Sequence, residues 1–260
     1  MSKENKDYFA KTLEKGIRIL NLFDENHPNW SLTEIAGQLK FNTTTAYRLV
    51  NTFVELGYLN KDHLSKRLQL GNMSFVLGNR LLNGSETNKL IEPLVDEIHA
   101  RDNISIDVSL FHSPQLVNVY KRETSHTLTY RQDTVSELLY CTASGKAVLA
   151  FLPPEKLNEL IKSQSFTRRV EKTITDVKVL YDDLERARQK GYALNNEEYI
   201  NGLIAIAAPI LNRSTKYPLG AVSFTSTTLD HTLAEFTEQY ADVLCDLAKR
   251  LSDVFRGSDG

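Results

Sequence analysis

The chain has 260 residues, 41% of them hydrophobic and 25% charged, and this composition excludes a disordered or fibrous protein. Its length predicts a small domain joined to a larger one. The net charge of −2 argues against a nonspecific coat for nucleic acid, but residues 1–85 hold 11 Lys and Arg against 8 Asp and Glu, while residues 86–260 hold 20 against 25. Positive charge is therefore concentrated towards the N-terminus.

Membrane and export segments are not expected. No apolar run approaches the roughly 18 residues of a membrane span, and the opening MSKENKDYFAK is polar where a signal peptide would be apolar. We therefore expect a cytoplasmic protein with no membrane partner. Cys141 and Cys245 lack metal-site spacing, which predicts reduced, buried thiols without a chemical role.

Helical periodicity predicts two short helices near the N-terminus. The segment TLEKGIRILNLF is expected to bury one apolar face, made of Leu13, Ile17, Leu20 and Phe23. The segment SLTEIAGQL begins with a capping box formed by Ser31 and Glu34. Both helices therefore have a face to pack.

A third helix is predicted in FNTTTAYRLVNTFVELGYL, capped by Asn42 or Thr43 and ended by Gly57. Its apolar stripe consists of Ala46, Leu49, Val50, Phe53 and Leu56. Because only about three residues separate it from the second helix, the pair has the spacing of a helix-turn-helix. The following YLNKDHLSKRLQL predicts two short strands around a polar turn, a wing.

The polar side of this third helix predicts DNA binding. A helix about 10 to 12 Å wide fits the major groove, where hydroxyl groups and arginine reach phosphates and base edges. The predicted reading surface consists of Thr43, Thr44, Thr45, Tyr47, Arg48 and Asn51, and the wing is expected to add backbone contacts from Lys61, Lys66 and Arg67. The alternative is a docking or dimerisation module whose polar residues face water.

The remainder of the chain alternates helices with paired strands. NMSFVLGNRLL predicts a linking helix with a domain boundary near Gly84, followed by a helix in ETNKLIEPLVDEIHAR. Hairpins are predicted from ISIDVSLF with QLVNVY and from LIAIAAPIL with LGAVSFTST, and a helix in VKVLYDDLERARQKGYAL ends at Gly191. A long helix from Leu233 to Val254 closes the chain. Short turns between strands imply an antiparallel sheet in an α+β domain.

The sequence shows no catalytic or metal-binding motif with the required spacing. TASGKA lacks the glycine of a phosphate loop, and no nucleophile elbow surrounds Ser144. The six histidines lack metal-ligand spacing, and the adjacent Glu197 and Glu198 are expected to point to opposite faces of an extended segment. We therefore expect no catalytic residues, no metal and no cofactor.

The order of these segments is similar to a known family. LTEIAGQLKFNTTTAYRLVNTFVELGYL followed by RLQLG resembles the winged-helix domain of the isocitrate lyase regulator (IclR) family of bacterial transcription factors. YCTASGKAVLAFLPPEKL, GYALNNEEYINGLIAIAAPI and GAVSFTST resemble its effector-binding domain, whose fold is of the GAF/PAS kind. The resemblance spans about residues 10–255.

The resemblance implies an α+β protein with three parts. These are a winged helix-turn-helix DNA-binding domain at residues 1–72, a linking helix at 73–85 that helps to pair subunits, and an effector-binding and oligomerisation domain at 86–260 with an antiparallel sheet flanked by helices. It also implies an effector site formed by Ala143, Ser144, Gly145, Asn195, Leu203, Ala205, Ser223 and Thr225.

The chemistry of that implied site favours an anion. Small residues at the start of a helix leave backbone N–H groups open to a carboxylate. Asn195 stands where the family often has an acid, and Ala205 where it often has a cysteine. The lost negative charge predicts a small organic acid, with aromatic acids among the candidates. The alternative is that Ser223 and Thr225 only satisfy neighbouring strands.

The leading interpretation is a ligand-responsive transcription regulator. Its expected partners are double-stranded operator DNA, a small-molecule effector and a second copy of the chain, because paired modules match palindromic half-sites. The alternatives are a cytosolic enzyme with an N-terminal interaction module and a protein-interaction adaptor. The sequence leaves open the operator, the effector, repression or activation, and dimer or tetramer.

Overall fold

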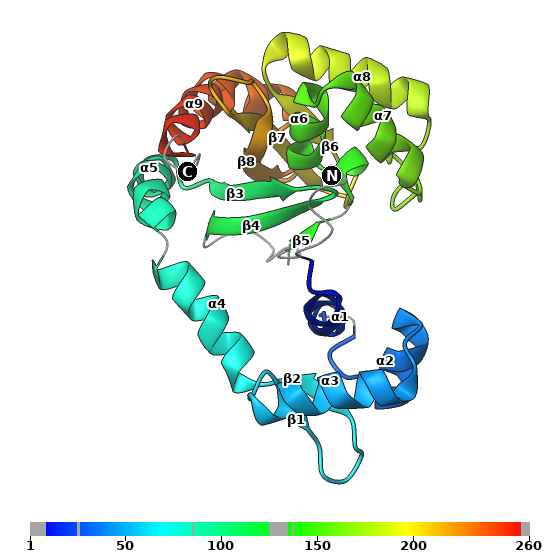
Figure 1. Ribbon diagram of the computed structural model, residues 1–260. Coiled ribbons are helices and arrows are strands. Elements are labelled where there is room, and N and C mark those ends of the chain that lie inside the picture. The colour runs from blue at the N-terminus through cyan, green and yellow to red at the C-terminus, as the bar shows by residue number, and fades with distance from the viewer. Residues whose placement is uncertain (1–8, 25–26, 85, 125–134, 137, 256–260) are drawn as a thin grey trace. The chain divides into compact units, whose positions relative to one another are not determined.

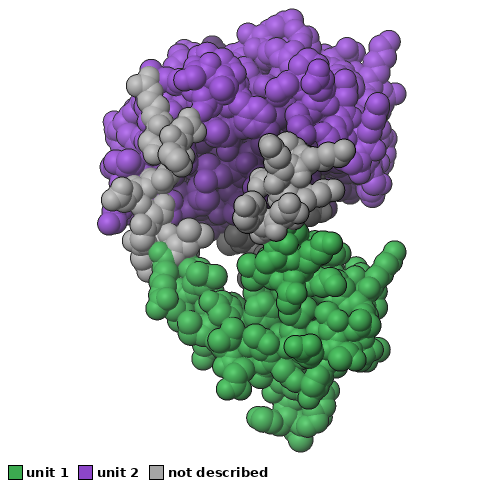
Figure 2. Space-filling view, viewed as in Figure 1, with its two compact units in different colours: residues 1–85 green, residues 86–260 purple. Residues whose placement is uncertain are grey.

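The computed structural model contains two compact units, residues 1–85 and 86–260, which are coloured separately in Figure 2. It describes residues 9–24, 27–84, 86–124, 135–136 and 138–255. Helices and strands are labelled in Figure 1. None of the described helices is long and apolar enough to cross a membrane.

The N-terminal unit is a winged helix-turn-helix. It contains the helices α1 (Lys11–Leu20), α2 (Leu32–Leu39) and α3 (Thr43–Glu55), followed by the antiparallel strands β1 (Leu59–Lys61) and β2 (Leu68–Leu70). A bridge between Trp30 and Leu68 ties the segment before α2 to the wing. Ile19, Ile35, Val50, Leu59 and Leu68 form the centre of its core.

Both predicted helix caps of this unit are confirmed. Ser31 Oγ accepts from the Glu34 N–H at 3.2 Å, and Glu34 Oε2 accepts from the Ser31 N–H at 2.7 Å. At α3, Asn42 is the cap, because its Oδ1 accepts from the Thr45 N–H at 2.7 Å. These bonds satisfy donors that a first helical turn leaves free and so set where α2 and α3 begin.

The predicted buried face of α1 is wrong for two of its four residues. Leu13 and Ile17 are 64% and 46% exposed, whereas Ile19 is fully buried. The reason is Gly16, which is buried and lies so close to Phe53 of α3 that a Cβ atom would stand 3.1 Å from the Phe53 ring. The helix therefore turns its glycine side towards α3, a contact that a search for apolar side chains overlooks.

Two helices follow the wing, α4 (Asn72–Gly84) in the first unit and α5 (Glu86–Asp102) in the second. Within α4, the Phe75 and Leu77 side chains are exposed, while Met73 and Val76 are partly buried. The helix predicted from NMSFVLGNRLL is thus present, and it leaves large apolar side chains open to solvent.

The C-terminal unit is built on one antiparallel sheet in the order β5-β4-β3-β8-β7-β6 (Figure 1). The strands are β3 (Ser105–His112), β4 (Gln115–Arg122), β5 (Val135–Ser136), β6 (Ala193–Asn196), β7 (Leu203–Leu211) and β8 (Pro218–Thr227). Both predicted hairpins, β3 with β4 and β7 with β8, are confirmed.

Helices cover both faces of this sheet (Figure 1). One face packs on α5 and α9 (Leu233–Val254), and the other on α6 (Ala143–Phe151), α7 (Pro154–Ser163) and α8 (Val177–Lys190), which follow the short 3₁₀ helix η2 (Leu139–Cys141). The predicted end of α8 at Gly191 is confirmed by its left-handed backbone, φ 84°. The α+β architecture is therefore as predicted.

Strand β8 divides its side chains between the two cores. Val222 and Phe224 pack on the α5–α9 side, while Ala221 packs on the α6 side. Because side chains alternate along a strand, Ser223 and Thr225 face the α6 side as well. The sheet thus presents hydroxyl groups to the space beside α6.

We predict that Ile19→Ala destabilises the N-terminal unit by about 2 to 5 kcal/mol, because it opens a cavity in the core. The matched control on the same helix, Ile17→Ala, should change stability by less than about 0.5 kcal/mol, since its side chain faces solvent. Urea unfolding followed by fluorescence of Trp30, the only tryptophan of the chain, measures both. Equal losses of stability in the two variants would mean that Ile17 is buried, as the sequence pattern predicts.

Candidate functional site

The first turn of α6 carries open backbone donors. Thr142 caps the helix, accepting from the Gly145 N–H at 3.1 Å while its own hydroxyl donates to the Leu138 carbonyl at 3.3 Å. The N–H groups of Ala143 and Ser144 donate to no oxygen among the described residues. Such donors, aligned with the positive end of the helix dipole, suit an anion.

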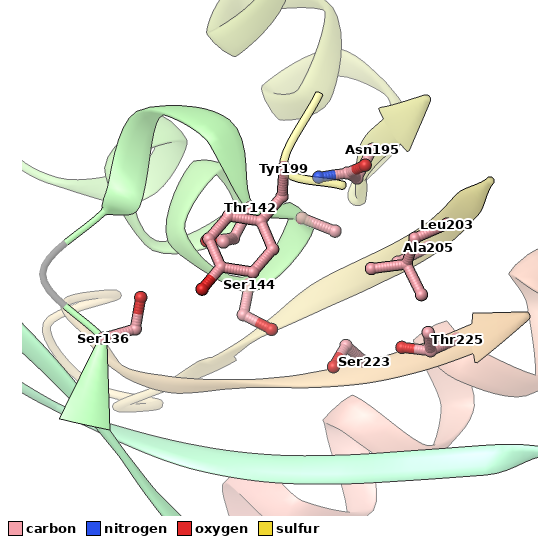
Figure 3. Close-up of a pocket in the computed structure, with 10 residues that line it drawn as sticks. Ser136, Thr142, Ser144, Asn195, Tyr199, Leu203, Ala205, Ser223 and Thr225 are labelled. Carbon is pink, nitrogen blue, oxygen red and sulfur yellow. The ribbon is translucent and has the colours of Figure 1, made fainter. Parts of the chain in front are cut away.

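A pocket lies between this helix start and the sheet, enclosing about 470 Å³ together with its open mouth (Figure 3). Its wall combines small hydroxyl side chains with apolar ones from β7 and from the turn that follows β6. The lining residues are Ser136, Thr142, Ala143, Ser144, Asn195, Tyr199, Leu203, Ala205, Ser223 and Thr225.

Seven of the eight residues implied for an effector site line this pocket. The exception is Gly145, which packs against the backbone of η2: a Cβ atom there would stand 2.3 Å from the Leu139 carbonyl oxygen. The structure gives this glycine a packing role, since only a residue without Cβ permits so close an approach.

Three lining residues were missed from the sequence: Ser136, Thr142 and Tyr199. Thr142 could have been found, because a threonine directly before a helix is a common N-cap. Ser136 lies on the two-residue strand β5, and Tyr199 in the turn between β6 and β7, so no periodicity marks either one. Only the folded chain brings them together.

The Asn195 side chain helps to build the pocket wall. Its Nδ2 donates to the Cys141 carbonyl at 2.6 Å, and its Oδ1 accepts from the Glu198 N–H at 3.2 Å. The amide therefore ties β6 to the end of η2 and closes the turn that carries Tyr199. Because the Nδ2 and Oδ1 atoms of Asn195 both bond to backbone groups of the protein, this side chain mainly supports the wall.

A buried ion cluster anchors the same turn to α6. Lys146 is only 1% exposed, and its Nζ lies 2.8 Å from both carboxylate oxygens of Glu198 and 2.8 Å from Oδ2 of Asp183 on α8. Burial raises the pKa of Glu198, partly offset by the Lys146 ammonium. Burial acts in the same direction on Asp183, but Lys146 and Arg186 hold its pKa below the ordinary value.

Glu197 and Glu198 point in different directions as predicted, but the predicted extended segment is wrong: β6 ends at Asn196, and Glu197 lies in a bend with a left-handed backbone, φ 57°. Glu197 bonds to Lys172 at the surface, whereas Glu198 points inward to Lys146. Because Lys146 is fully occupied by carboxylates, the TASGKA segment offers no free lysine to a phosphate or a carbonyl substrate. The cluster is structural.

The described residues of the pocket wall form no catalytic constellation. The ten lining residues provide hydroxyl groups and an amide but no carboxylate, imidazole or thiol. Burial raises the pKa of the neighbouring Cys141 to about 11, so its thiol stays protonated at neutral pH. Among the described residues, no group of three or more His, Cys, Asp and Glu is placed to hold a metal ion.

The predicted DNA-reading residues lie along the start and outer side of α3. Thr43, Thr44, Tyr47 and Arg48 are exposed, while Thr45 and Asn51 are partly buried. Thr44, Arg48 and Asn51 face away from Ala46 and Val50, which are buried in the core, whereas Thr43 lies seven residues before Val50 on the same side and is exposed at the start of the helix. A continuous polar surface therefore remains open on this helix.

Of the three cations on the wing, Lys61 and Lys66 form no ion pair with any residue that the structure describes, whereas Arg67 is engaged. Lys61 and Lys66 are exposed. The Arg67 guanidinium donates to the Asn29 carbonyl at 2.9 Å and to Glu34 Oε2 at 3.1 Å, so it links the wing to the start of α2. Asp62 shapes the wing turn by accepting from the Ser65 N–H at 2.6 Å.

Comparison with family models covers most of the chain. The model described as "Bacterial transcriptional regulator IclR C-terminal" matches residues 80–253, and the "IclR helix-turn-helix domain" model matches residues 12–63. The HTH-type transcriptional regulator KipR of Bacillus subtilis is 25% identical over 244 residues, which cover 93% of this chain and 97% of KipR.

Solved structures show the same arrangement of elements. IclR of Thermotoga maritima is 28% identical, with a TM-score of 0.67 over 95% of this chain and 99% of that one. An IclR homolog complexed with 4-hydroxybenzoate, from Microbacterium hydrocarbonoxydans, is 21% identical and gives a TM-score of 0.71 over 94% and 99% of the two chains. The second likeness concerns the fold alone.

We predict that Lys146→Met destabilises the C-terminal unit by about 3 to 5 kcal/mol, because it leaves the buried Glu198 carboxylate without its cation. Lys156→Met is the control, since that lysine forms an exposed ion pair with Glu159 and should leave stability unchanged. Urea unfolding followed by circular dichroism compares the two. Equal stability of both variants would contradict a structural role for the cluster.

Proposed function

The chain belongs to the IclR family of bacterial transcriptional regulators, and we propose that a small organic acid bound beside α6 controls its binding to operator DNA. Members of this family combine a helix-turn-helix DNA-binding domain with a C-terminal effector-binding domain, and this chain has both. The observation that carries the proposal is the pocket in which two N–H groups of α6, which donate to no oxygen of the described residues, meet the hydroxyl-bearing strand β8. In our proposal, residues 1–72 bind DNA, residues 86–260 bind the effector, and the helix at residues 73–85 connects these two domains.

The DNA contact in this proposal is made by α3 and the wing. Arg48, Tyr47 and the threonines Thr43 and Thr44 are exposed at the start of α3, where a recognition helix approaches base edges. Lys61 and Lys66 contribute phosphate contacts from the wing. Arg67 contributes less, because its guanidinium already bonds within the protein.

The proposed effector is a small carboxylate held by the Ala143 and Ser144 N–H groups. Ser144, Ser223 and Thr225 add hydroxyl donors, and Leu203 and Ala205 provide an apolar wall. The complex of the Microbacterium homolog with 4-hydroxybenzoate supports an organic acid as the ligand class.

We further propose a homodimer in the cytoplasm. Phe75 and Leu77 of α4 and Leu13 and Ile17 of α1 are large apolar side chains left exposed on one protomer, and a partner copy would cover them. Two copies also match palindromic half-sites. Sedimentation of the full chain as a single 29.5 kDa species would contradict this pairing.

The alternative of an enzyme is disfavoured by the pocket wall, which offers binding groups without a base or a nucleophile partner. The relatives compared above are also named as regulators. An adaptor that binds only protein would show no dependence of a DNA complex on salt or on Arg48. Operator binding therefore separates the three possibilities.

We predict that Arg48→Ala weakens operator binding by about 1 to 3 kcal/mol if Arg48 contacts a base, and lowers the salt slope by about one if it contacts a phosphate. Arg101→Ala is the charge-matched control, because Arg101 pairs with its neighbour Asp102 in the other unit. Fluorescence anisotropy with an operator selected from random DNA, at several salt concentrations, measures both quantities. Unchanged affinity and slope in folded Arg48→Ala would remove Arg48 from the interface.

We predict that Ser223→Val weakens binding of the carboxylate effector by about 1.5 to 3 kcal/mol, because a hydrogen bond to a charged group is lost. Ser226→Val changes the opposite face of the same strand, where Ser226 contacts His231, and should leave effector affinity unaltered. Calorimetry with the carboxylate found by mass spectrometry of copurified small molecules makes the comparison. Equal affinities would mean that Ser223 only supports the strand.

A further inference from the structure

One aromatic side chain stands in the wall of the pocket. Of the ten residues that line it, only Tyr199 carries a ring, while Leu203 and Ala205 provide the aliphatic part of the wall. Figure 3 shows the Tyr199 ring extending from its turn towards Ser144, whose N–H group is one of the two proposed to hold a carboxylate. A ligand held at the start of α6 therefore lies next to this ring.

The ring of Tyr199 is covered on one face by an arginine. Tyr199 is 7% exposed, and the Arg169 guanidinium lies over its ring, 4.4 Å from the ring centroid. Arg169 Nε also donates to the Tyr199 carbonyl at 3.4 Å, and the Thr173 hydroxyl donates to the carbonyl of the preceding Glu198 at 2.7 Å. The ring is thus fixed in place and borders the pocket with its other face and its edges.

Arg169 brings a positive charge to this side of the pocket. Its guanidinium forms no ion pair with any residue that the structure describes, whereas the Lys146 ammonium is shared by two carboxylates. Burial raises the pKa of Cys141 to about 11, and Arg169 is the largest influence that opposes this rise, so its charge acts at the end of η2. The face of a tyrosine ring repels an anion, and a cation behind the ring offsets that repulsion.

We propose that Tyr199, backed by Arg169, makes the pocket select an aromatic carboxylate over a saturated one of similar size. This inference rests on the proposed binding of a carboxylate beside α6. Two aromatic rings attract each other in offset-stacked or edge-to-face contact, beyond what the buried area provides. A saturated ring against Tyr199 gains from the buried area alone.

The rest of the wall does not make this distinction. Leu203 and Ala205 contact aromatic and saturated rings alike, and the hydroxyl groups of Ser223 and Thr225 bond to the oxygen atoms of either acid. A saturated ring exposes more apolar area than an aromatic ring with the same number of carbon atoms, so an aliphatic wall would favour the saturated acid. A preference for the aromatic acid is therefore specific to Tyr199.

The test compares benzoate with cyclohexanecarboxylate, which are both ionised at a pH of about 7.5. Calorimetry with the full chain should show benzoate bound about three- to ten-fold more tightly. Tyr199→Leu should reduce this preference to less than about 1.5-fold with both acids still bound, whereas Tyr199→Phe, which keeps the ring, should retain it. Tyr181→Leu is the matched control, because Tyr181 lies on α8 and bonds to Asn158 outside the pocket lining.

Two neighbouring arginines test the cation separately. Arg169→Met removes the charge behind the ring and should weaken binding of both acids by about two-fold or more. Arg168→Met is the charge-matched control, since the Arg168 guanidinium donates to the Glu171 carbonyl and to Thr175, and it should leave both affinities unchanged. Wild-type affinity for both acids in Arg169→Met would overturn the part assigned to Arg169.

The outcomes separate this inference from the proposed effector site. Equal binding of the two acids to the wild-type chain, or tighter binding of cyclohexanecarboxylate, overturns the role of Tyr199 alone, as does a preference for benzoate that survives in Tyr199→Leu. Failure of both acids to bind overturns the proposed carboxylate site and this inference with it. If Tyr199→Leu does not fold, Tyr199→Phe decides: loss of the preference in that variant means that the hydroxyl group selects and the ring does not, which rejects the proposal.

Discussion

The buried ammonium of Lys146 holds together the segments of the C-terminal unit that surround the pocket. A charge at 1% exposure is tolerated only with partners, and the carboxylates of Glu198 and Asp183 provide them at 2.8 Å. These contacts join α6, α8 and the turn after β6. The Asn195 amide adds a second link, because it joins β6 to η2 through its hydrogen bond to the Cys141 carbonyl. The pocket lies where these segments meet, so its shape depends on this cluster. The open N–H groups of Ala143 and Ser144 are presented by the same helix.

The two units present their functional groups in opposite ways. In the N-terminal unit, the capped start of α3 directs side chains outward, and the wing turn, shaped by Asp62, leaves Lys61 and Lys66 in solvent. In the C-terminal unit, hydroxyl groups are buried on a sheet face that helices cover. Exposed polar and basic side chains suit a large, charged partner such as DNA, whereas a polar sheet face covered by helices suits a small molecule. For an effector to alter DNA binding, it must bind two states of the chain with different affinity.

Most elements could be predicted because their causes are local. Capping residues such as Ser31 and Asn42, the helical spacing of Ala46 and Val50, and Gly191 at the end of α8 act within a few residues of the chain. The face of α1 could not be predicted in this way. Its buried side includes Gly16, whose contribution is the space it leaves for Phe53 of another helix. Helical periodicity detects large apolar side chains, but it does not detect a glycine that allows two helices to approach closely.

The sequence by itself determined the two-part α+β organisation, the order and caps of the helices, the antiparallel hairpins and, through resemblance, seven residues that line the pocket. Tertiary structure alone decided that Gly145 serves packing, that Arg67 is bonded to Glu34, and that Ser136 and Tyr199 join the wall. It also placed the Arg169 guanidinium over the Tyr199 ring, although 30 positions separate them in the chain. The physical reason is that register and burial depend on contacts between distant segments, and a single tyrosine in a turn has no local pattern that reveals its neighbours.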